Sequence, residues 1–401
     1  MRIKLKFTFI PAFLIILLTA VNAQTPRTFI LDSNYLNTVK AKLASGDATV
    51  AGAYKMLLKK ADKALAVEPF TVMKKKQVPS SGDKHDFVSL APYHWPNPKT
   101  PDGLPYIRKD GQRNPEVEDF QDKEDLPKMV TNVEILSLAY FYSDNAKYAE
   151  KATQLLRTWF LDPATLMNPN LNHAQMIKGE NQGRGAGIID SRHFIRLVDA
   201  IGLLGNSKAW TKTDQQGMEK WFADYLNWLQ TSENGKEEID APNNHGTWYD
   251  VQRLTYSLFT GNKALAESIV ANIQKRLAAQ LDNNLMFPKE MERTLSLHYT
   301  SFNLTAHYNA ALLAESLKLN IWETGGEKSL KAVTEKLYPY LSNQKKWEGQ
   351  QIKEFEWEMA ASLLCTAAVK YNKPEYAQSV KNLKLDEDAV PWLILTRYMI
   401  K

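Results

Sequence analysis

Cysteine is almost absent from this sequence of 401 residues, in which Cys365 stands alone. One cysteine excludes a disulfide scaffold and any zinc site made of cysteines. Because Cys365 lies in an apolar run, Ala361–Val369, we expect it to be a small core residue. The seven histidines are scattered singly, without the paired helical spacing of zinc enzymes, so the sequence indicates neither a metal site nor a cofactor.

Long apolar runs are also lacking after residue 23. Before it, the chain begins with basic residues, continues with the nearly apolar stretch Phe7–Ala20, and then reaches the small residues Val21-Asn22-Ala23. This pattern predicts a secretory signal peptide over residues 1–23, with an apolar part too short to span a membrane. We therefore expect a periplasmic or secreted protein from residue 24 onward, with no attachment to a membrane.

A strong charge of one sign is missing as well. The formal net charge is +5, and removing the three basic residues of the signal peptide lowers it to +2. A nearly neutral protein has no global basic field, which argues against nucleic acid as a partner. An acidic ligand would need a local cationic site instead. The run Lys74-Lys75-Lys76 is typical of a solvated, charged face.

Helical periodicity, by contrast, is abundant. Apolar residues recur at the spacing of one helix face through most of the chain after residue 131. The pattern predicts helices over Asn132–Ser143, Ala146–Leu161, Gly187–Leu204, Trp210–Leu229, Gly246–Phe259, Lys263–Leu281, Leu297–Leu319, Ser329–Leu341, Phe355–Tyr371 and Val390–Met399.

One arrangement occurs three times: a helix ends in an aromatic-rich turn, an asparagine follows, and an alanine-bearing helix begins. It is found at Tyr140–Ala149, Leu258–Ala266 and Val369–Ala377. Helical hairpins that each bury one stripe must pack side by side. We therefore predict an all-α fold, an incomplete or closed α/α toroid (α/α barrel) forming one catalytic domain over residues 24–401. An open solenoid is the alternative.

Two segments break the helical pattern. Glu68–Gln121 is rich in proline, glycine and aromatic residues, including Tyr93, His94 and Trp95, which favours an ordered functional loop. Asp162–Arg184 contains many amide side chains. Amides and exposed aromatic rings suit a carbohydrate surface, with ordinary loop chemistry as the alternative.

The sharpest polar cluster is the stretch Asp240–Tyr249. A proline and two asparagines before an apolar helix make a good helix start, which accounts for Asn243. It does not account for Asn244 and His245, or for the aromatic residues Trp248 and Tyr249 that follow. A helix N-terminus also favours anionic ligands.

The second polar cluster is the stretch Glu290–Tyr299, in which Arg293 lies six positions before Tyr299. A positive charge near a phenol favours the ionised form, so we expect Arg293 to lower the pKa of Tyr299. A tyrosine of this kind can exchange a proton at moderately alkaline pH.

These residue types suit the breaking of a uronic-acid polysaccharide by β-elimination. The C6 carboxylate must be neutralised so that the C5 proton becomes acidic, a base must remove that proton, and an acid must protonate the departing O4. An asparagine helped by histidine or arginine meets the first need. Histidine or tyrosine meets the second, and tyrosine the third.

Several blocks of sequence resemble the alginate lyase family of secreted bacterial polysaccharide lyases, which have α/α toroid folds. They are His85–Tyr93 with Trp95–Pro98, Gly183–Asp190 with Arg192-His193, Asn243-Asn244-His245, and Arg293 with Leu297-His298-Tyr299. The resemblance implies that Asn244 neutralises the carboxylate, that His245 is the base or assists it, and that Tyr299 is the acid, or both acid and base. Arg293 would tune Tyr299 or bind the acid group. In the family the tyrosine lies one position further from the arginine.

Arginine can bind a planar carboxylate through two parallel hydrogen bonds. The arginines near these motifs are therefore the best candidates for binding the carboxylates of the substrate. The predicted substrate-binding residues are Arg184, Arg192, His193, Tyr93, His94, Trp95, Trp248, Tyr249 and His298. The expected partner is an anionic polysaccharide, alginate or another polyuronate such as glucuronan, acted on by a monomer.

Two other classes remain open. An inverting glycoside hydrolase on the same toroid would need two carboxylates about 6.5–9.5 Å apart. The acidic residues available for it are Glu180, Asp190, Glu290, Glu292, Glu356 and Glu358. A glycan-binding protein without activity is the second class, and it would bind oligosaccharides without turnover.

Overall fold

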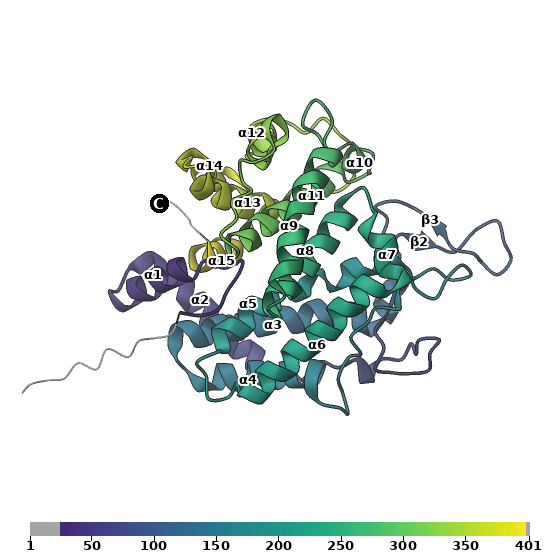
Figure 1. Ribbon diagram of the computed structural model, residues 1–401, viewed down its shortest axis with the longest axis horizontal. Coiled ribbons are helices and arrows are strands. Elements are labelled where there is room, and N and C mark those ends of the chain that lie inside the picture. The colour runs from purple at the N-terminus through teal and green to yellow at the C-terminus, as the bar shows by residue number, and fades with distance from the viewer. Residues whose placement is uncertain (1–24, 398–401) are drawn as a thin grey trace, which may run out of the picture.

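The computed structural model describes residues 25–397, so the predicted signal peptide over residues 1–23 lies outside the described residues. Helices dominate the described part of the chain (Figure 1). The α-helices are α1 (Ser33–Ala44), α2 (Ala48–Leu65), α3 (Gln121–Ser143), α4 (Ala146–Leu156), α5 (Phe194–Leu204), α6 (Lys212–Thr231), α7 (Glu233–Ile239), α8 (Asn244–Phe259), α9 (Lys263–Gln280), α10 (Pro288–Met291), α11 (Ser296–Glu315), α12 (Leu330–Leu341), α13 (Trp357–Lys370), α14 (Pro374–Ser379) and α15 (Ala389–Thr396). No helix among residues 25–397 is long and apolar enough to cross a membrane.

The helices form a ring with a second layer outside it. In the inner layer α3 packs on α5, α5 on α8, α8 on α11 and α11 on α13, and α15 returns to contact both α13 and α2. Because α2 in turn packs on α3, the ring is closed. Outside it, α4 lies on α3, α6 and α9 lie on α8, and α12 and α14 lie on α13. This arrangement is the predicted α/α toroid, and the open solenoid is excluded.

The three recurring turns are helical hairpins, as predicted. Between α3 and α4, Asp144 adopts a left-handed conformation with φ 55° and Asn145 caps α4 by accepting from Lys147 N. Gly261, at φ 78°, and the capping Asn262 make the same connection between α8 and α9. At the third turn Asn372 is left-handed, with φ 52°, and Pro374 opens α14. Asparagine serves the three turns in two ways: Asn145 and Asn262 cap the next helix, whereas Asn372 supplies the left-handed residue.

Burial explains why two helices occupy the inner layer. Residues of α8 and α11 are buried on almost every side, including polar ones such as Asp250 and Asn303. A helix surrounded by other helices has no solvent face to keep polar. Charge inside this layer is paired: Arg276 of α9 donates to Asp250 at 2.8 Å. Cys365 lies buried in α13, as expected.

The sequence pattern was less accurate at element ends and before residue 131. It did not predict α1, α2 or α7. The predicted helix Gly187–Leu204 begins as a 3₁₀ segment, Gly185–His193, and becomes regular only at α5. The predicted helix to Leu319 ends at Glu315, and the left-handed Lys318, at φ 60°, follows.

The two non-helical segments meet in space, which the sequence did not show. Strand β1 (Val88–Leu90) of the first pairs in parallel with β4 (His173–Met176) of the second. Within the first segment, β2 (His94–Trp95) pairs antiparallel with β3 (Ile107–Arg108). The first segment is therefore anchored to the second and also folded back on itself.

The carbohydrate surface predicted over Asp162–Arg184 is reduced at three of its asparagines, whereas Arg184 lines the cavity described below. Asn168 and Asn170 both donate to the carboxylate of Asp86, and Asn172 accepts from the indole of Trp228. These three amides are thus hydrogen-bonded to side chains of the protein itself. For these three residues the structure supports the ordinary loop interpretation.

The expectation of a solvated Lys74-Lys75-Lys76 run fails at its middle residue. Lys75 is buried and forms an ion pair with Asp122 of α3 at 2.6 Å, and its ammonium also donates to the carbonyl of Asp86. Burial raises the pKa of Asp122 to about 6, against the opposing effect of Lys75. The pair thus fastens the first non-helical segment to the inner layer.

We expect Lys75→Met to lower the free energy of unfolding by about 3–5 kcal/mol at neutral pH, because it leaves a buried carboxylate unpaired. The loss should shrink at acidic pH: a raised pKa means that the folded state takes up the proton first, so protonation favours folding as the pH falls. Urea unfolding measures both effects. Lys147→Met, which breaks the exposed pair with Asp62, is the control and should leave the free energy of unfolding almost unchanged, because water screens an exposed pair. Equal losses in the two variants would contradict this role.

Candidate active site

A cavity of about 1060 Å³ lies where the inner helices begin. The first turns of α8, α11 and α13 line it, together with the start of α3 and the 3₁₀ segment before α5. Each helix N-terminus carries free backbone N–H groups and a partial positive charge. Several of them facing one cavity create a field that favours an anionic ligand.

Cationic side chains add to this field. Those lining the cavity are Arg108, Arg113, Lys123, Arg184, Arg192, Arg293 and Lys353. Lys123, for example, is held by Asp190, and Arg113 by Glu124. Arg184 and Arg192 form no ion pair within residues 25–397. Their charge is therefore available to a carboxylate that enters the cavity.

The position of Arg184 is set by the glycines on either side of it, where the backbone packs closely against the segment that contains β4. A Cβ atom on Gly183 would lie 1.9 Å from the carbonyl oxygen of Asn172, and one on Gly187 would lie 2.4 Å from that of Ala174. Only glycine fits at these contacts. The segment therefore lies against β4, and Arg184 donates to Gln175 at 3.0 Å while its Nε atom has no partner.

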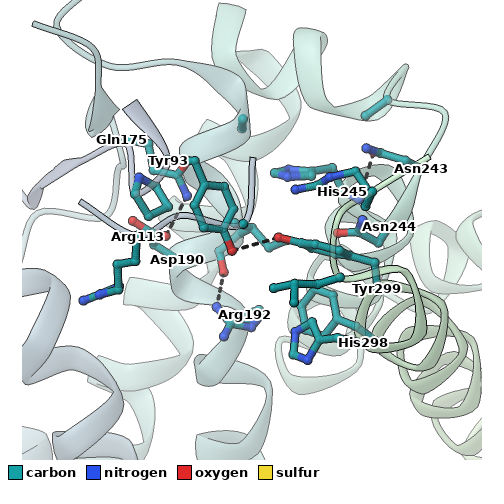
Figure 2. Close-up of a pocket in the computed structure, with 18 of the residues that line it drawn as sticks. Tyr93, Arg113, Gln175, Asp190, Arg192, Asn243, Asn244, His245, His298 and Tyr299 are labelled. Atoms are coloured by element: carbon teal, nitrogen blue, oxygen red, sulfur yellow. Dashed lines mark hydrogen bonds between the residues drawn. The ribbon is translucent and has the colours of Figure 1, made fainter. Parts of the chain in front are cut away.

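The start of α8 brings Asn243, Asn244 and His245 to the cavity (Figure 2). Asn243 caps the helix by accepting from the backbone N–H of His245, as the capping pattern predicted. Asn244 is buried, and it is held by Glu290 of α10: its backbone N–H and its side-chain amide donate to the two carboxylate oxygens at 2.7 and 2.8 Å. The side-chain oxygen of Asn244 has no partner.

Glu238 holds His245 in place. Its buried carboxylate lies 2.6 Å from Nδ1 of His245. A carboxylate at Nδ1 fixes the proton there and leaves Nε2 free to accept one. Sequence reasoning missed Glu238, which lies in the last turn of the short helix α7, seven positions before His245. The available sign was an acidic residue a few positions before the asparagine–histidine pair.

Tyr299 projects from the first turn of α11 and donates to the hydroxyl of Tyr93 at 2.8 Å (Figure 2). The guanidinium of Arg293 lies over its ring, 3.7 Å from the centroid. Burial nevertheless raises the pKa of Tyr299 far above that of a free tyrosine, the neighbouring Tyr93 adds to the rise, and Arg293 only opposes it. The expected lowering of this pKa is wrong, because desolvation outweighs the nearby cation.

Arg293 is engaged by a carboxylate of its own. Its Nε and Nη2 atoms donate to Asp110 at 2.9 and 2.7 Å, and Thr294 N donates to the same side chain. Burial alone would raise the pKa of Asp110, but these hydrogen bonds hold it well below its usual range. Arg293 precedes α11 and is not part of it. The altered spacing to Tyr299 therefore does not rotate the two side chains apart.

Three histidines of the cavity are expected to be neutral. Burial lowers the pKa values of His94, His193 and His298, and the arginines nearby lower them further. His193 accepts from Arg196 at 3.2 Å, and His298 stacks on Phe302. His193 lines the cavity, so its predicted place is plausible, but as a neutral side chain it would meet a carboxylate as a hydrogen-bond donor and not as a positive charge.

Three predicted binding residues lie away from the cavity. Trp248 packs on Phe302 in the core, and Tyr249 is buried with its hydroxyl donating to Leu229 O. Their side chains face the helix packing of α8. Trp95 lies in the β2–β3 hairpin, where its indole donates to Gln112 O. These three residues lie near the predicted motifs in the sequence, but their side chains do not point into the cavity.

Residues 25–397 hold no group of three or more His, Cys, Asp or Glu side chains arranged to bind a metal ion.

Comparison with known proteins agrees with this geometry. The sequence pattern of the alginate lyase family matches residues 71–347. A solved structure, an alginate lyase from Bacteroides ovatus, is 40% identical over 92% of this chain and 99% of its own, with a TM-score of 0.87. The chain belongs to the alginate lyase family. It is therefore a polysaccharide lyase, and the resemblance noted from the sequence motifs is confirmed.

More distant alginate lyase structures share the fold of this family member. A variant of alginate lyase A1-III complexed with a tetrasaccharide is 14% identical over 94% of this chain and 98% of its own, with a TM-score of 0.59. A second such variant complex is 13% identical over 92% and 96%, with a TM-score of 0.58. No curated protein matches the chain. These similarities support the toroid fold alone.

Proposed function

We propose that this lyase cleaves alginate, or a closely related polyuronate, by β-elimination in the cavity at the helix N-termini. The observation that carries the proposal is that Asn244, His245 and Tyr299, from distant stretches of chain, line one cavity among helix N-termini and unpaired arginines. These are the three side-chain types that the reaction requires. An anionic polysaccharide suits the field of the site.

In this mechanism His245 is the base. Its Nε2 atom takes the C5 proton, while Glu238 holds Nδ1 and stabilises the imidazolium that forms. The electron pair of the C5–H bond forms the C4=C5 double bond, and the C4–O4 bond breaks. Tyr299 gives its phenolic proton to O4, for which its raised pKa keeps it protonated. His245 then releases its proton to solvent, and Tyr299 regains one.

The carboxylate of the reacting uronate binds the Asn244 side of the cavity, with Arg192 supplying positive charge. Stabilisation of the charge that develops on this carboxylate makes the C5 proton acidic. Arg184 suits the carboxylate of a neighbouring sugar, since it also lacks an ion-pair partner. Tyr93 and His94 extend the same wall, and Arg293 positions Tyr299 by stacking on its ring.

A second arrangement uses Tyr299 as both base and acid. It would serve the epimer in which the C5 proton and O4 lie on the same face of the sugar, whereas His245 with Tyr299 serves the one in which they lie on opposite faces. Digestion of pure polymannuronate and polyguluronate separates the two arrangements.

The test of function is digestion of polymannuronate, polyguluronate and glucuronan, with ultraviolet absorbance of the C4=C5 product and reducing ends followed together. We expect both signals to rise in parallel on at least one polymer of the alginate pair. Reducing ends without absorbance would indicate hydrolysis, and tight binding with neither signal would indicate a glycan-binding protein. Turnover of glucuronan alone would correct the substrate.

We further propose that the enzyme acts as a monomer in the periplasm or outside the cell. The basic and apolar pattern of residues 1–23 supports export. The single catalytic domain over residues 24–401 likewise stays a prediction.

A further inference from the structure

Glu290 is a buried carboxylate that the mechanism above does not use. It lies on α10, fully shielded from solvent, and no lysine, arginine or histidine forms an ion pair with it among residues 25–397. Its two hydrogen bonds both come from Asn244. An ionised carboxylate so buried is costly unless it is paired.

The side-chain amide of Asn244, in turn, has a buried oxygen without a hydrogen-bond donor. Its nitrogen is turned to Glu290, and its oxygen is buried without a partner. The two ends of an amide have nearly the same shape, so hydrogen bonding decides which end faces which group. Exchanging them while Glu290 carries a proton gives the side-chain oxygen a partner: Glu290 still accepts from the backbone N–H of Asn244 and donates its proton to the side-chain oxygen. The side-chain NH2 group then occupies the position where the oxygen had no partner, and its hydrogens are left for a ligand.

We propose that Glu290 acts as a neutral carboxylic acid that holds the oxygen of the Asn244 amide and turns both amide hydrogens toward the substrate carboxylate. Glu290 is then a positioning residue, acting through Asn244. This inference rests on the proposed function, in which Asn244 neutralises the reacting uronate.

Charge supports the same assignment. The carboxylate of a bound uronate would lie against Asn244, and an ionised Glu290 directly behind that amide would repel it. Burial raises the pKa of Glu290, although the hydrogen bonds from Asn244 and the charges of Arg293 and His245 oppose the rise. Arg293 is already paired with Asp110, and His245 with Glu238, so neither is free to compensate Glu290.

The test compares Glu290→Gln with Glu290→Ala. Glutamine resembles the protonated acid, since it can accept from the Asn244 N–H and donate to the side-chain oxygen. We expect Glu290→Ala to lower kcat by about 10²–10³-fold with little change in KM, as for loss of a donor that stabilises developing charge. Glu290→Gln should recover most of that loss and should remove any alkaline decline in kcat caused by ionisation of Glu290. Glu292→Ala, an exposed neighbour paired with Lys289, is the matched control and should leave kcat unchanged.

A Glu290→Gln variant as slow as Glu290→Ala would overturn the proposal, because it would show that the ionised form is needed. Infrared difference spectra between wild type and Glu290→Gln give a second measurement that does not depend on activity. A carboxylic acid C=O band at the assay pH, present in wild type and absent from the variant, is expected, and its absence would also overturn the proposal. If wild type cleaves no polyuronate, the proposed function fails, while this band still decides the state of Glu290.

Discussion

Tyr299→Phe should lower kcat by about 10²–10⁴-fold, the range expected for loss of a positioned proton donor. The substitution removes only the hydroxyl that would protonate O4. The ring that stacks under Arg293 remains, so KM and the helical circular dichroism should change little. The initial rate of ultraviolet absorbance increase measures the effect.

Tyr148→Phe is the matched control. Its hydroxyl donates to Asp62 on the outer surface, far in the fold from the cavity, and its loss should leave the rate unchanged. Ionisation of Tyr299 itself should cause no decline of the rate near the usual tyrosine pKa of about 10, since an acid with a raised pKa keeps its proton longer. A Tyr299→Phe enzyme that keeps most of the rate would show that another group protonates O4.

His245→Ala carries the second largest expected effect, a loss of about 10²–10⁴-fold in kcat for the removal of the base. Glu238→Gln should also slow the enzyme, because the charge that stabilises the imidazolium is removed. Since Glu238 acts through His245, the double variant should be no slower than His245→Ala alone. Initial rates of the four enzymes complete the cycle.

Glu233→Gln provides the control on the same short helix. Glu233 is exposed and paired with Lys236, so this variant should match wild type. Losses that multiply in the His245 and Glu238 double variant would mean that the two residues act independently. In that case Glu238 would have a role other than holding the imidazole.

The sequence predicted the ring of helices because helical periodicity and the turn at Asn145, Asn262 and Asn372 are local properties. The capping role of Asn243 was predictable for the same reason. The ends of the helices were less predictable: before α5 the chain is a 3₁₀ segment that lies against β4, and β4 is held by its pairing with β1 from a distant part of the chain.

The candidate site depended on contacts that sequence spacing does not encode. Asp110 lies 183 positions from Arg293, and Tyr93 lies 206 positions from Tyr299, yet both pairs are hydrogen-bonded. The pKa of Tyr299 could not be foreseen either. The cation at Arg293 is visible in the sequence, whereas the desolvation that outweighs it exists only in the folded chain.

Aromatic residues near a motif were the least reliable sign of a substrate-binding side chain. Trp248 and Tyr249 follow the asparagine–histidine pair, but their side chains pack into the hydrophobic core. Lys75 shows the converse error, since a lysine run gave no sign that its middle residue is buried against Asp122. In both cases the helix or loop was placed well, and the direction of the side chain depended on its partners.

A crystal structure of the Tyr299→Phe enzyme with a bound uronate oligosaccharide tests the central claim most directly. We predict one sugar whose carboxylate meets the Asn244 amide and Arg192, whose C5 lies about 3–3.5 Å from Nε2 of His245, and whose O4 faces the ring at position 299. If His245 and position 299 contact different sugars, with no monosaccharide reaching both, the two groups cannot share one elimination and the account is contradicted.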